Sequence, residues 1–82
     1  MHIIILGPGC PNCKKLEALT KEATAELGLA DVTFQKVSDL MEIMKYPILR
    51  TPGLVINGKV VCSGRVPTKG EIKSWLNTAS SN

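Results

Sequence analysis

The feature that most constrains the fold is a short apolar run near the start of the chain, Ile3-Ile4-Ile5-Leu6. Its residues are mostly β-branched and do not alternate with polar residues, which is typical of a strand buried on both faces. Gly7-Pro8-Gly9 then ends the run, because glycine and proline interrupt regular structure. Residues 2–6 are therefore predicted to form an inner strand of a sheet.

Helical and strand patterns follow this run in turn. Between residues 11 and 27 apolar residues recur at helical spacing, and Gly28 is suited to end that helix. Residues 32–37 alternate between apolar and polar side chains, which predicts a second strand. Asp39-Leu40-Met41-Glu42 has the pattern of a capping box and predicts a short helix that ends near Tyr46.

The next pattern is a β-hairpin around Asn57-Gly58. This pair lies between two β-branched runs and favours a type I′ turn, in which both turn residues have positive φ. Counting outward from the turn pairs Leu54 with Val61 and Gly53 with Cys62. Cys62 is therefore expected one strand away from the loop that precedes the hairpin, near that loop but outside it.

A second capping box, Thr68-Lys69-Gly70-Glu71, predicts the start of a last helix. The resulting order, β-α-β-α-β-β-α, predicts an α/β fold with a mixed four-stranded sheet flanked by helices. The chain has 82 residues, which is enough for one domain with a modest core. We expect that domain to span residues 1–77 and residues 78–82 to form a disordered polar tail.

Composition excludes several functional classes. The net charge is only +3 and the basic residues are scattered, so nucleic-acid binding is not predicted. The longest apolar run is too short for a membrane span or a secretory leader, and we expect a cytoplasmic protein. Three cysteines are an odd number, which argues against a secreted disulfide framework.

The cysteines of Cys10-Pro11-Asn12-Cys13 stand where the first strand gives way to the first helix. Cys10 falls near the N-cap, and Pro11 suits the first helical position. The free amides and the positive end of the helix dipole favour a thiolate on Cys10, with Lys14 and Lys15 adding positive charge. An exposed thiolate that attacks and a second thiol that resolves the mixed disulfide suit thiol–disulfide exchange.

Together with Thr51-Pro52 before the hairpin and Gly64 before the last helix, this motif resembles the thioredoxin-fold superfamily. The closest resemblance is to its small, glutaredoxin-sized redox-active disulfide proteins, and it covers nearly the whole chain. It implies a protein disulfide oxidoreductase in which Cys10 is the nucleophile and Cys13 the resolving cysteine. It further implies that Pro52 is cis and lies against the disulfide, and that Thr51 offers its backbone to the substrate.

The resemblance also sets expectations for partners. Pro11 and Asn12 are expected to contact the substrate, and no cofactor or metal is implied. The substrates are expected to be protein disulfides, and the protein is expected to be a monomer. Glutathione is a less favoured electron donor than a reductase of the thioredoxin-reductase type, because Ser63–Thr68 holds one glycine and no acidic residue to fix glutathione.

The sequence departs from the thioredoxin pattern at two informative places. Gly9 stands where thioredoxin has a tryptophan before its first cysteine. No acidic residue occurs in the first two predicted strands, where thioredoxin keeps a buried aspartate for proton transfer. These departures affect the redox potential and the proton route rather than the exchange chemistry.

Two alternatives stay open from the residues alone. Small copper, mercury or zinc carriers also place a Cys-x-x-Cys pair at a strand–helix junction. A structural zinc site, however, needs four ligands, and the sequence has no second Cys-x-x-Cys pair. A thioredoxin-like scaffold that only binds partners is the other, and it has no need of both cysteines and Thr51-Pro52. Cys62 is interpreted as a buried small apolar residue.

Overall fold

The computed structural model describes residues 1–80 of the chain. Its elements, in chain order, are β1 (His2–Leu6), α1 (Pro11–Glu26), β2 (Thr33–Val37), α2 (Leu40–Ile43), β3 (Gly53–Ile56), β4 (Lys59–Ser63) and α3 (Lys69–Ser80). This order confirms the predicted β-α-β-α-β-β-α sequence of elements.

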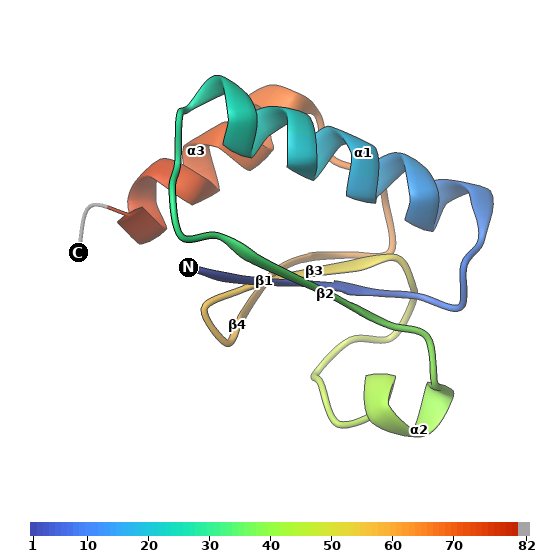
Figure 1. The fold of residues 1–82 in the computed structure, drawn as a ribbon. Helices are drawn as coiled ribbons and strands as arrows, with labels where there is room; N and C mark the ends of the chain where they lie inside the picture. Colours follow the sequence, from blue (N-terminus) through green and yellow to red (C-terminus); the bar gives the residue numbers. More distant parts are fainter. Residues whose placement is uncertain (81–82) are drawn as a thin grey trace.

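The four strands form one mixed sheet in the order β2-β1-β3-β4. β1 pairs in parallel with β2 and antiparallel with β3, and the hairpin adds β4 antiparallel to β3. α1 and α3 lie side by side on one face of the sheet, and α2 lies on the other (Figure 1). β1 is therefore an inner strand with cover on both faces, as its apolar run predicts.

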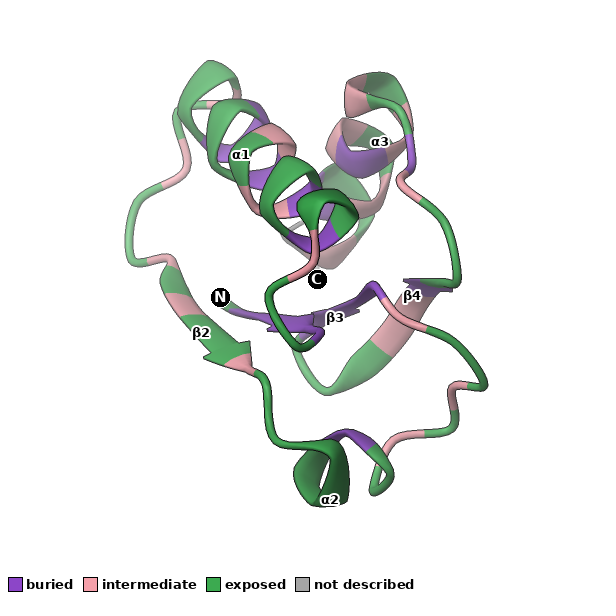
Figure 2. Cartoon of the chain, turned by 90° about the vertical axis from the view of Figure 1, so that its right-hand side faces the viewer, coloured by how far each residue is buried: buried purple, intermediate pink, exposed green. Residues whose placement is uncertain are grey.

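Two apolar clusters fill the spaces on either side of the sheet. The larger lies under α1 and α3 and includes Ile3, Leu16 and Ile72, all fully buried. The smaller lies toward α2 and includes Leu6 and Ile43. Figure 2 shows the difference, because the inner faces of α1 and α3 are buried while α2 is mostly exposed. The sheet thus has one thickly covered face and one thinly covered face.

The hairpin keeps the predicted pairing next to the turn, at Ile56–Lys59 and Val55–Val60, but its register differs further out. Leu54 lies opposite Cys62 and Gly53 opposite Ser63, with a shift between Leu54 and Val55. Simple counting from the turn was wrong here because Val61 is an extra residue on β4, as in a β-bulge. A one-residue slip turns a side chain to the other face of a sheet, and Cys62 consequently points into the larger cluster.

The helix ends follow local chemistry. Gly28 has φ +65° just after α1, which is the left-handed conformation that glycine adopts readily. α2 ends at Ile43, earlier than predicted, and tight i to i+3 bonds at Lys45 and Tyr46 replace helical ones. α3 includes residues 78–80, which we had assigned to the polar tail, whereas residues 81 and 82 lie outside the described residues.

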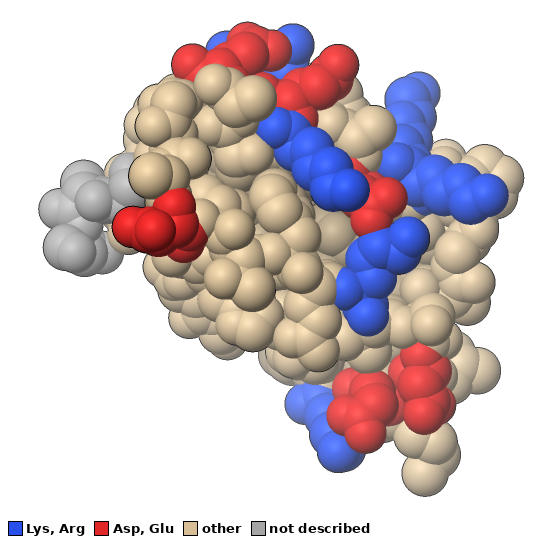
Figure 3. Space-filling model, in the orientation of Figure 1, with Lys and Arg blue, Asp and Glu red and all other residues tan. Residues whose placement is uncertain are grey.

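None of the helices within residues 1–80 is long and apolar enough to cross a bilayer. On the face drawn in Figure 3, basic and acidic side chains are interspersed, without a continuous field of one sign. This distribution agrees with the scattered charges of the sequence.

Candidate active site

Cys10 is the N-cap of α1. Its backbone is extended, with φ −68° and ψ 164°, and Pro11 occupies the first turn without losing a helical hydrogen bond. The backbone N–H of Cys13 points at the Cys10 sulfur, with 3.3 Å between nitrogen and Sγ. The first turn contains no acidic residue to oppose a negative charge there. The helix start therefore directs its partial positive charge to this sulfur.

Cys10 and Cys13 form a disulfide, with their Cα atoms 5.1 Å apart. The two cysteines differ in access, because Cys10 is half-buried while Cys13 is only 5% exposed. The next residues along the helix, Lys14 and Lys15, are exposed. Pro11 and Asn12 are exposed between the cysteines, where a partner molecule could touch them.

Gly7 lies beneath this disulfide, at the end of β1. A Cβ atom on Gly7 would collide with the Cys13 sulfur, and it would also lie 3.9 Å from the Thr51 Cβ. The absence of a side chain at Gly7 thus lets two distant segments approach each other. β1, α1 and the loop before β3 meet at this glycine.

Thr51 and Pro52 lie in the loop before β3, and Thr51 is the residue of that loop that approaches Gly7. Thr51 is half-buried, Pro52 is buried, and the peptide bond between them is cis. The carbonyl of Pro52 accepts a hydrogen bond from the Gly64 amide, 2.9 Å away, which ties this loop to the end of the hairpin. The end of the hairpin therefore holds the loop next to Thr51.

Cys62 lies in a different environment, at the corner between β4 and α3. It is buried in the larger apolar cluster, and burial raises the pKa of its thiol above the ordinary value. The Cys62 thiol donates a hydrogen bond to the backbone carbonyl oxygen of Arg65, which lies 3.9 Å from its Sγ. The structure thus places Cys62 in the core, in agreement with its interpretation from the sequence as a buried small apolar residue.

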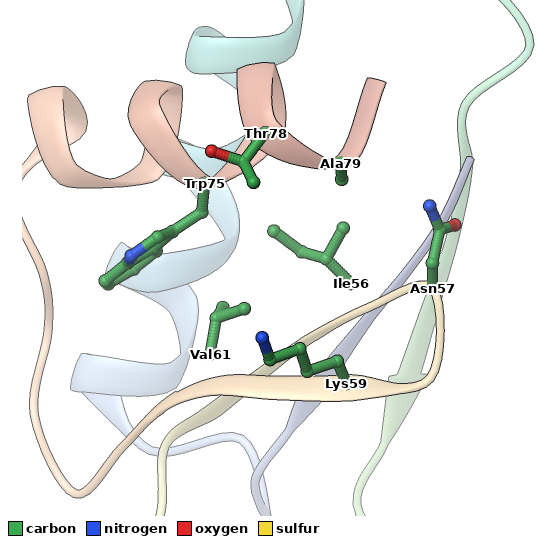
Figure 4. Close-up of a pocket in the computed structure, with 7 residues that line it drawn as sticks. All are labelled: Ile56, Asn57, Lys59, Val61, Trp75, Thr78 and Ala79. Atoms are coloured by element: carbon green, nitrogen blue, oxygen red, sulfur yellow. The ribbon is translucent and has the colours of Figure 1, made fainter. Parts of the chain in front are cut away.

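Other candidate features lie away from the cysteine pair. A groove of about 400 Å³ between the hairpin and α3 is lined largely by apolar side chains, with Trp75 facing Val61 across it and Lys59 along its edge (Figure 4). It is at the end of the molecule opposite the start of α1 (Figure 1). Within residues 1–80, no three His, Cys, Asp or Glu side chains converge in a way that could hold a metal ion.

Sequence reasoning missed three residues of this region. Gly7 was treated only as the end of a strand, and a contact with Cys13 across the fold leaves no local signal. Glu17 and Lys36 line a small cavity beside Cys13. The spacing of Cys13 and Glu17, four residues apart on one helix, could have indicated that they share a face.

A mixed sheet with a Cys-x-x-Cys disulfide at its first helix start defines a thiol–disulfide site on a thioredoxin-like fold. The model of the thioredoxin domain family matches residues 1–77. The chain therefore belongs to that family and is a thiol–disulfide oxidoreductase, with Cys10-Pro11-Asn12-Cys13 as its redox motif.

Two thioredoxins are similar to this chain over most of its length. The chain is 41% identical to a thioredoxin of Methanothermobacter thermautotrophicus over 76 residues, which cover 93% of this chain and 97% of the relative. It is 38% identical to a thioredoxin of Methanocaldococcus jannaschii over 74 residues, covering 90% and 84% of the two chains. These alignments span the whole fold rather than the cysteine motif alone.

Proposed function

We propose that Cys10 attacks protein disulfides and that Cys13 releases the product. The observation that carries this assignment is the asymmetry of the pair. The half-buried Cys10 sulfur receives an amide N–H at the helix start, whereas Cys13 is buried one turn further on. A thiolate at Cys10 gains the helix-start interactions that lower a thiol pKa, and it is the sulfur that a partner can reach.

The reaction has two exchange steps. The Cys10 thiolate attacks one sulfur of the target disulfide, forms a mixed disulfide and expels the other target sulfur as a thiolate. Cys13, once deprotonated, then attacks the Cys10 sulfur, forms the intramolecular disulfide and expels the second target thiolate. The target gains two electrons, and the two released thiolates take up protons from the surroundings.

Protein targets are supported by the surface beside Thr51. Within residues 1–80, the large apolar side chains that stand exposed all belong to one segment, which we call the apolar shelf: Leu40, Met41, Met44 and Leu49. A groove of about 450 Å³ runs from this shelf to Arg50 and Thr51. Exposed apolar surface of this kind marks places where proteins bind.

The loop at Thr51 supplies the second part of the docking site. We assign Thr51 a backbone role, in which an extended segment of the target pairs with it as an added strand. We assign the exposed Pro11 and Asn12 at the start of α1, and the buried Pro52 behind Thr51, to the same docking site. A folded or unfolded protein can cover Thr51, Pro11 and Asn12 together with the apolar shelf, whereas Pro52 lies buried behind Thr51.

The electron donor that fits best is a reductase of the thioredoxin-reductase type or another protein dithiol. Glutathione needs fixed partners for its two carboxylates and its amine. The Glu71 carboxylate, which lies at the start of α3, already accepts bonds from the Arg65 guanidinium, at 2.8 and 3.1 Å, and from the Thr68 amide. A carboxylate engaged in this way is not positioned to hold the amine of glutathione.

A comparison of donors tests the proposal. The pure protein is given insulin with either NADPH and thioredoxin reductase or glutathione and glutathione reductase, and NADPH consumption is followed. We expect clear turnover with the reductase and slow turnover with glutathione. Equal turnover with both donors would contradict the donor assignment and indicate a glutaredoxin.

A variant on the apolar shelf tests the choice of substrate. Leu49→Ser should raise the KM for insulin while leaving the rate with a small aromatic disulfide unchanged. The matched control is Ala30→Ser, an exposed position outside the shelf. An unchanged KM for insulin in Leu49→Ser would remove the shelf from the docking site.

We further propose that the protein works as a monomer in the cytoplasm. A reducing compartment would keep Cys62, which forms no disulfide in the structure, as a thiol. Sedimentation of the reduced protein checks the first point, and fractionation of the source cells checks the second.

A further inference from the structure

A small cavity lies beside the buried cysteine of the redox pair. It measures about 40 Å³ and is lined by Cys13, Lys14 and Glu17 of α1 and by Lys36 of β2, with residues of β1 and its following loop beneath. That volume is enough for one water molecule. The cavity therefore brings the buried Cys13 together with a carboxylate-bearing residue, Glu17, and with two lysines.

Cys13 has to lose a proton before it can attack. Burial disfavours the charged form of a thiol, so a buried resolving cysteine needs an acceptor close to it. The first two strands contain no acidic residue, and the acceptor must come from another element. Glu17 follows Cys13 by four residues on α1, which places both side chains on one face of the helix.

The Glu17 carboxylate is held in position and keeps contact with solvent. Lys36 Nζ lies 3.4 Å from a carboxylate oxygen of Glu17, and the Glu17 side chain is 21% exposed. A proton that arrives at this carboxylate can pass on to bulk water. A lysine that fixes the carboxylate from the next strand keeps it at the mouth of the cavity.

We propose that Glu17, positioned by Lys36, accepts the thiol proton of Cys13 through one water in this cavity when Cys13 resolves a mixed disulfide. In that step the Cys13–Cys10 bond forms, the bond from Cys10 to the target sulfur breaks, and the target sulfur leaves with the bonding electron pair. The proton passes from Cys13 to Glu17 and then to solvent. This inference rests on the resolving role proposed for Cys13.

The charged residues around the cavity come from α1 and β2. α1 contributes Lys14 and Glu17, and β2 contributes Lys36, whereas β1 contributes only Ile5 to the lining. α3 meets α1 through the ion pairs of Glu26 with Lys69 and Lys73, which are made by the last residue of α1. Among the cavity residues, Glu17 is thus the carboxylate that can take the proton.

The test follows the two exchange steps separately, through the absorbance of the thiolate that each step releases. The reduced protein is mixed rapidly with an aromatic disulfide that releases a coloured thiolate, first when Cys10 attacks and again when Cys13 resolves. General bases contribute about 10²–10⁴-fold in enzymes, and an acceptor that acts through a water molecule is expected at or below the low end of that range. Glu17→Gln should slow the second phase at least about tenfold near neutral pH and leave the first within about twofold.

The pH dependence of the second phase gives a readout that a purely structural role would not move. The deficit of Glu17→Gln should shrink as pH rises, because hydroxide then deprotonates Cys13 without help. Lys36→Met should slow the second phase by less than Glu17→Gln does, because the Glu17 carboxylate is still present but has lost the partner that positions it. The matched control is Glu22→Gln, which removes an exposed carboxylate from α1 outside the cavity, and it should match the parent in both phases.

The outcomes distinguish the relay from the function on which it rests. A normal second phase that Glu17→Gln leaves unchanged at every pH would overturn the relay alone. An equal slowing of both phases would also overturn it, because Glu17 would then act on the helix start as a whole. If the parent protein itself shows no second phase, the resolving role of Cys13 fails and the relay fails with it.

Discussion

The starts of α1 and α3 are both capped by a side chain, but the capping atom is sulfur in α1 and oxygen in α3. Each follows a strand of the sheet, and each has a buried cysteine nearby, Cys13 at 5% and Cys62 at 9% exposure. At α3, the Thr68 hydroxyl accepts the Glu71 amide and the Glu71 carboxylate accepts the Thr68 amide, which completes a capping box. At α1, the cap is the sulfur of Cys10.

Under the proposed roles of Cys10 and Cys13, this difference explains why one thiol acts in exchange and the other does not. Burial alone does not, because the two buried cysteines are about equally hidden. A hydroxyl cap satisfies the amides of a helix start and is not itself a nucleophile there. When the cap is a cysteine, the same amides stabilise its thiolate, which can attack a disulfide. Cys13 has such a sulfur as its neighbour, and Cys62 has apolar side chains and a backbone carbonyl.

The largest effect is expected from the two cysteines at the start of α1. Cys10→Ser should lower insulin reduction by a factor on the order of 10³ or more, because no nucleophile remains. Cys13→Ser should still attack but should accumulate mixed disulfides with target proteins, which non-reducing gels and mass spectrometry detect. Trapping by Cys10→Ser through Cys13 or Cys62 would break the distinction between the two helix starts.

Gly7→Ala should disturb the sulfur-capped start of α1 without replacing either cysteine. The added methyl would collide with the Cys13 sulfur, and overpacking of this kind destabilises by about 1–3 kcal/mol. We also expect slower exchange with insulin, since the pair shifts relative to Thr51. Urea unfolding and the insulin assay measure the two effects.

The control for this change is Gly70→Ala, in the first turn of α3. A Cβ there would meet only the Thr68 hydroxyl at an ordinary distance of 3.9 Å. Alanine at this position should leave stability unchanged or raise it by up to about 1 kcal/mol, because glycine is unfavourable inside helices. Equal losses in both variants would mean that Gly7 has no special relation to the disulfide.

Cys62→Ala should have a smaller effect, confined to stability. Removing one buried sulfur is comparable to removing a methylene, which corresponds to about 1 kcal/mol. Insulin reduction should stay at the parent level, because this thiol lies in the core with its pKa raised by burial. A folded but inactive Cys62→Ala would move Cys62 into the site and remove the contrast between the two regions.

The smallest effect concerns acid stability at the start of α3. The Arg65 guanidinium lowers the pKa of Glu71 from 4.5 to about 2. The ionised carboxylate therefore stabilises the fold above pH 4.5, and this contribution is lost as pH falls from 4.5 toward about 2. Arg65→Gln should flatten the decline of unfolding free energy across that window.

Two further ion pairs set the background of that experiment. Glu26, bound by Lys69 and Lys73, has a pKa of about 2 and contributes to the same window, so part of the decline should persist. The control is Lys45→Gln, which removes a surface partner of Glu42 on α2 and should leave the decline as in the parent. A decline unchanged by Arg65→Gln would show that the Arg65–Glu71 pair has no influence on acid stability.

Sequence patterns predicted what local chemistry determines. The β1 run, the Asn57-Gly58 turn and the Thr68–Glu71 capping box each act within a few residues, and the structure has all three. The Cys10 cap was predictable for the same reason. The fold class followed because the order of strands and helices permits few topologies.

Features that depend on distant contacts were not predictable in this way. The extra residue at Val61 in β4 reversed the face on which Cys62 lies, and no turn signal announces it. The contact of Gly7 with Cys13 and the pairing of Glu17 with Lys36 arise only when β1, α1 and β2 are packed together. The residues proposed for proton transfer and for docking were therefore harder to predict from the sequence than the redox motif.

The most direct test of the account is the order in which the thiols of the reduced protein react. The protein is treated at neutral pH with a limiting amount of iodoacetamide, and the labelled cysteine is located by peptide mass spectrometry. The account predicts that Cys10 is alkylated first, with Cys13 and Cys62 largely unmodified at that point. Labelling of Cys13 before Cys10 would contradict it, because the sulfur at the helix start would then not be the nucleophile.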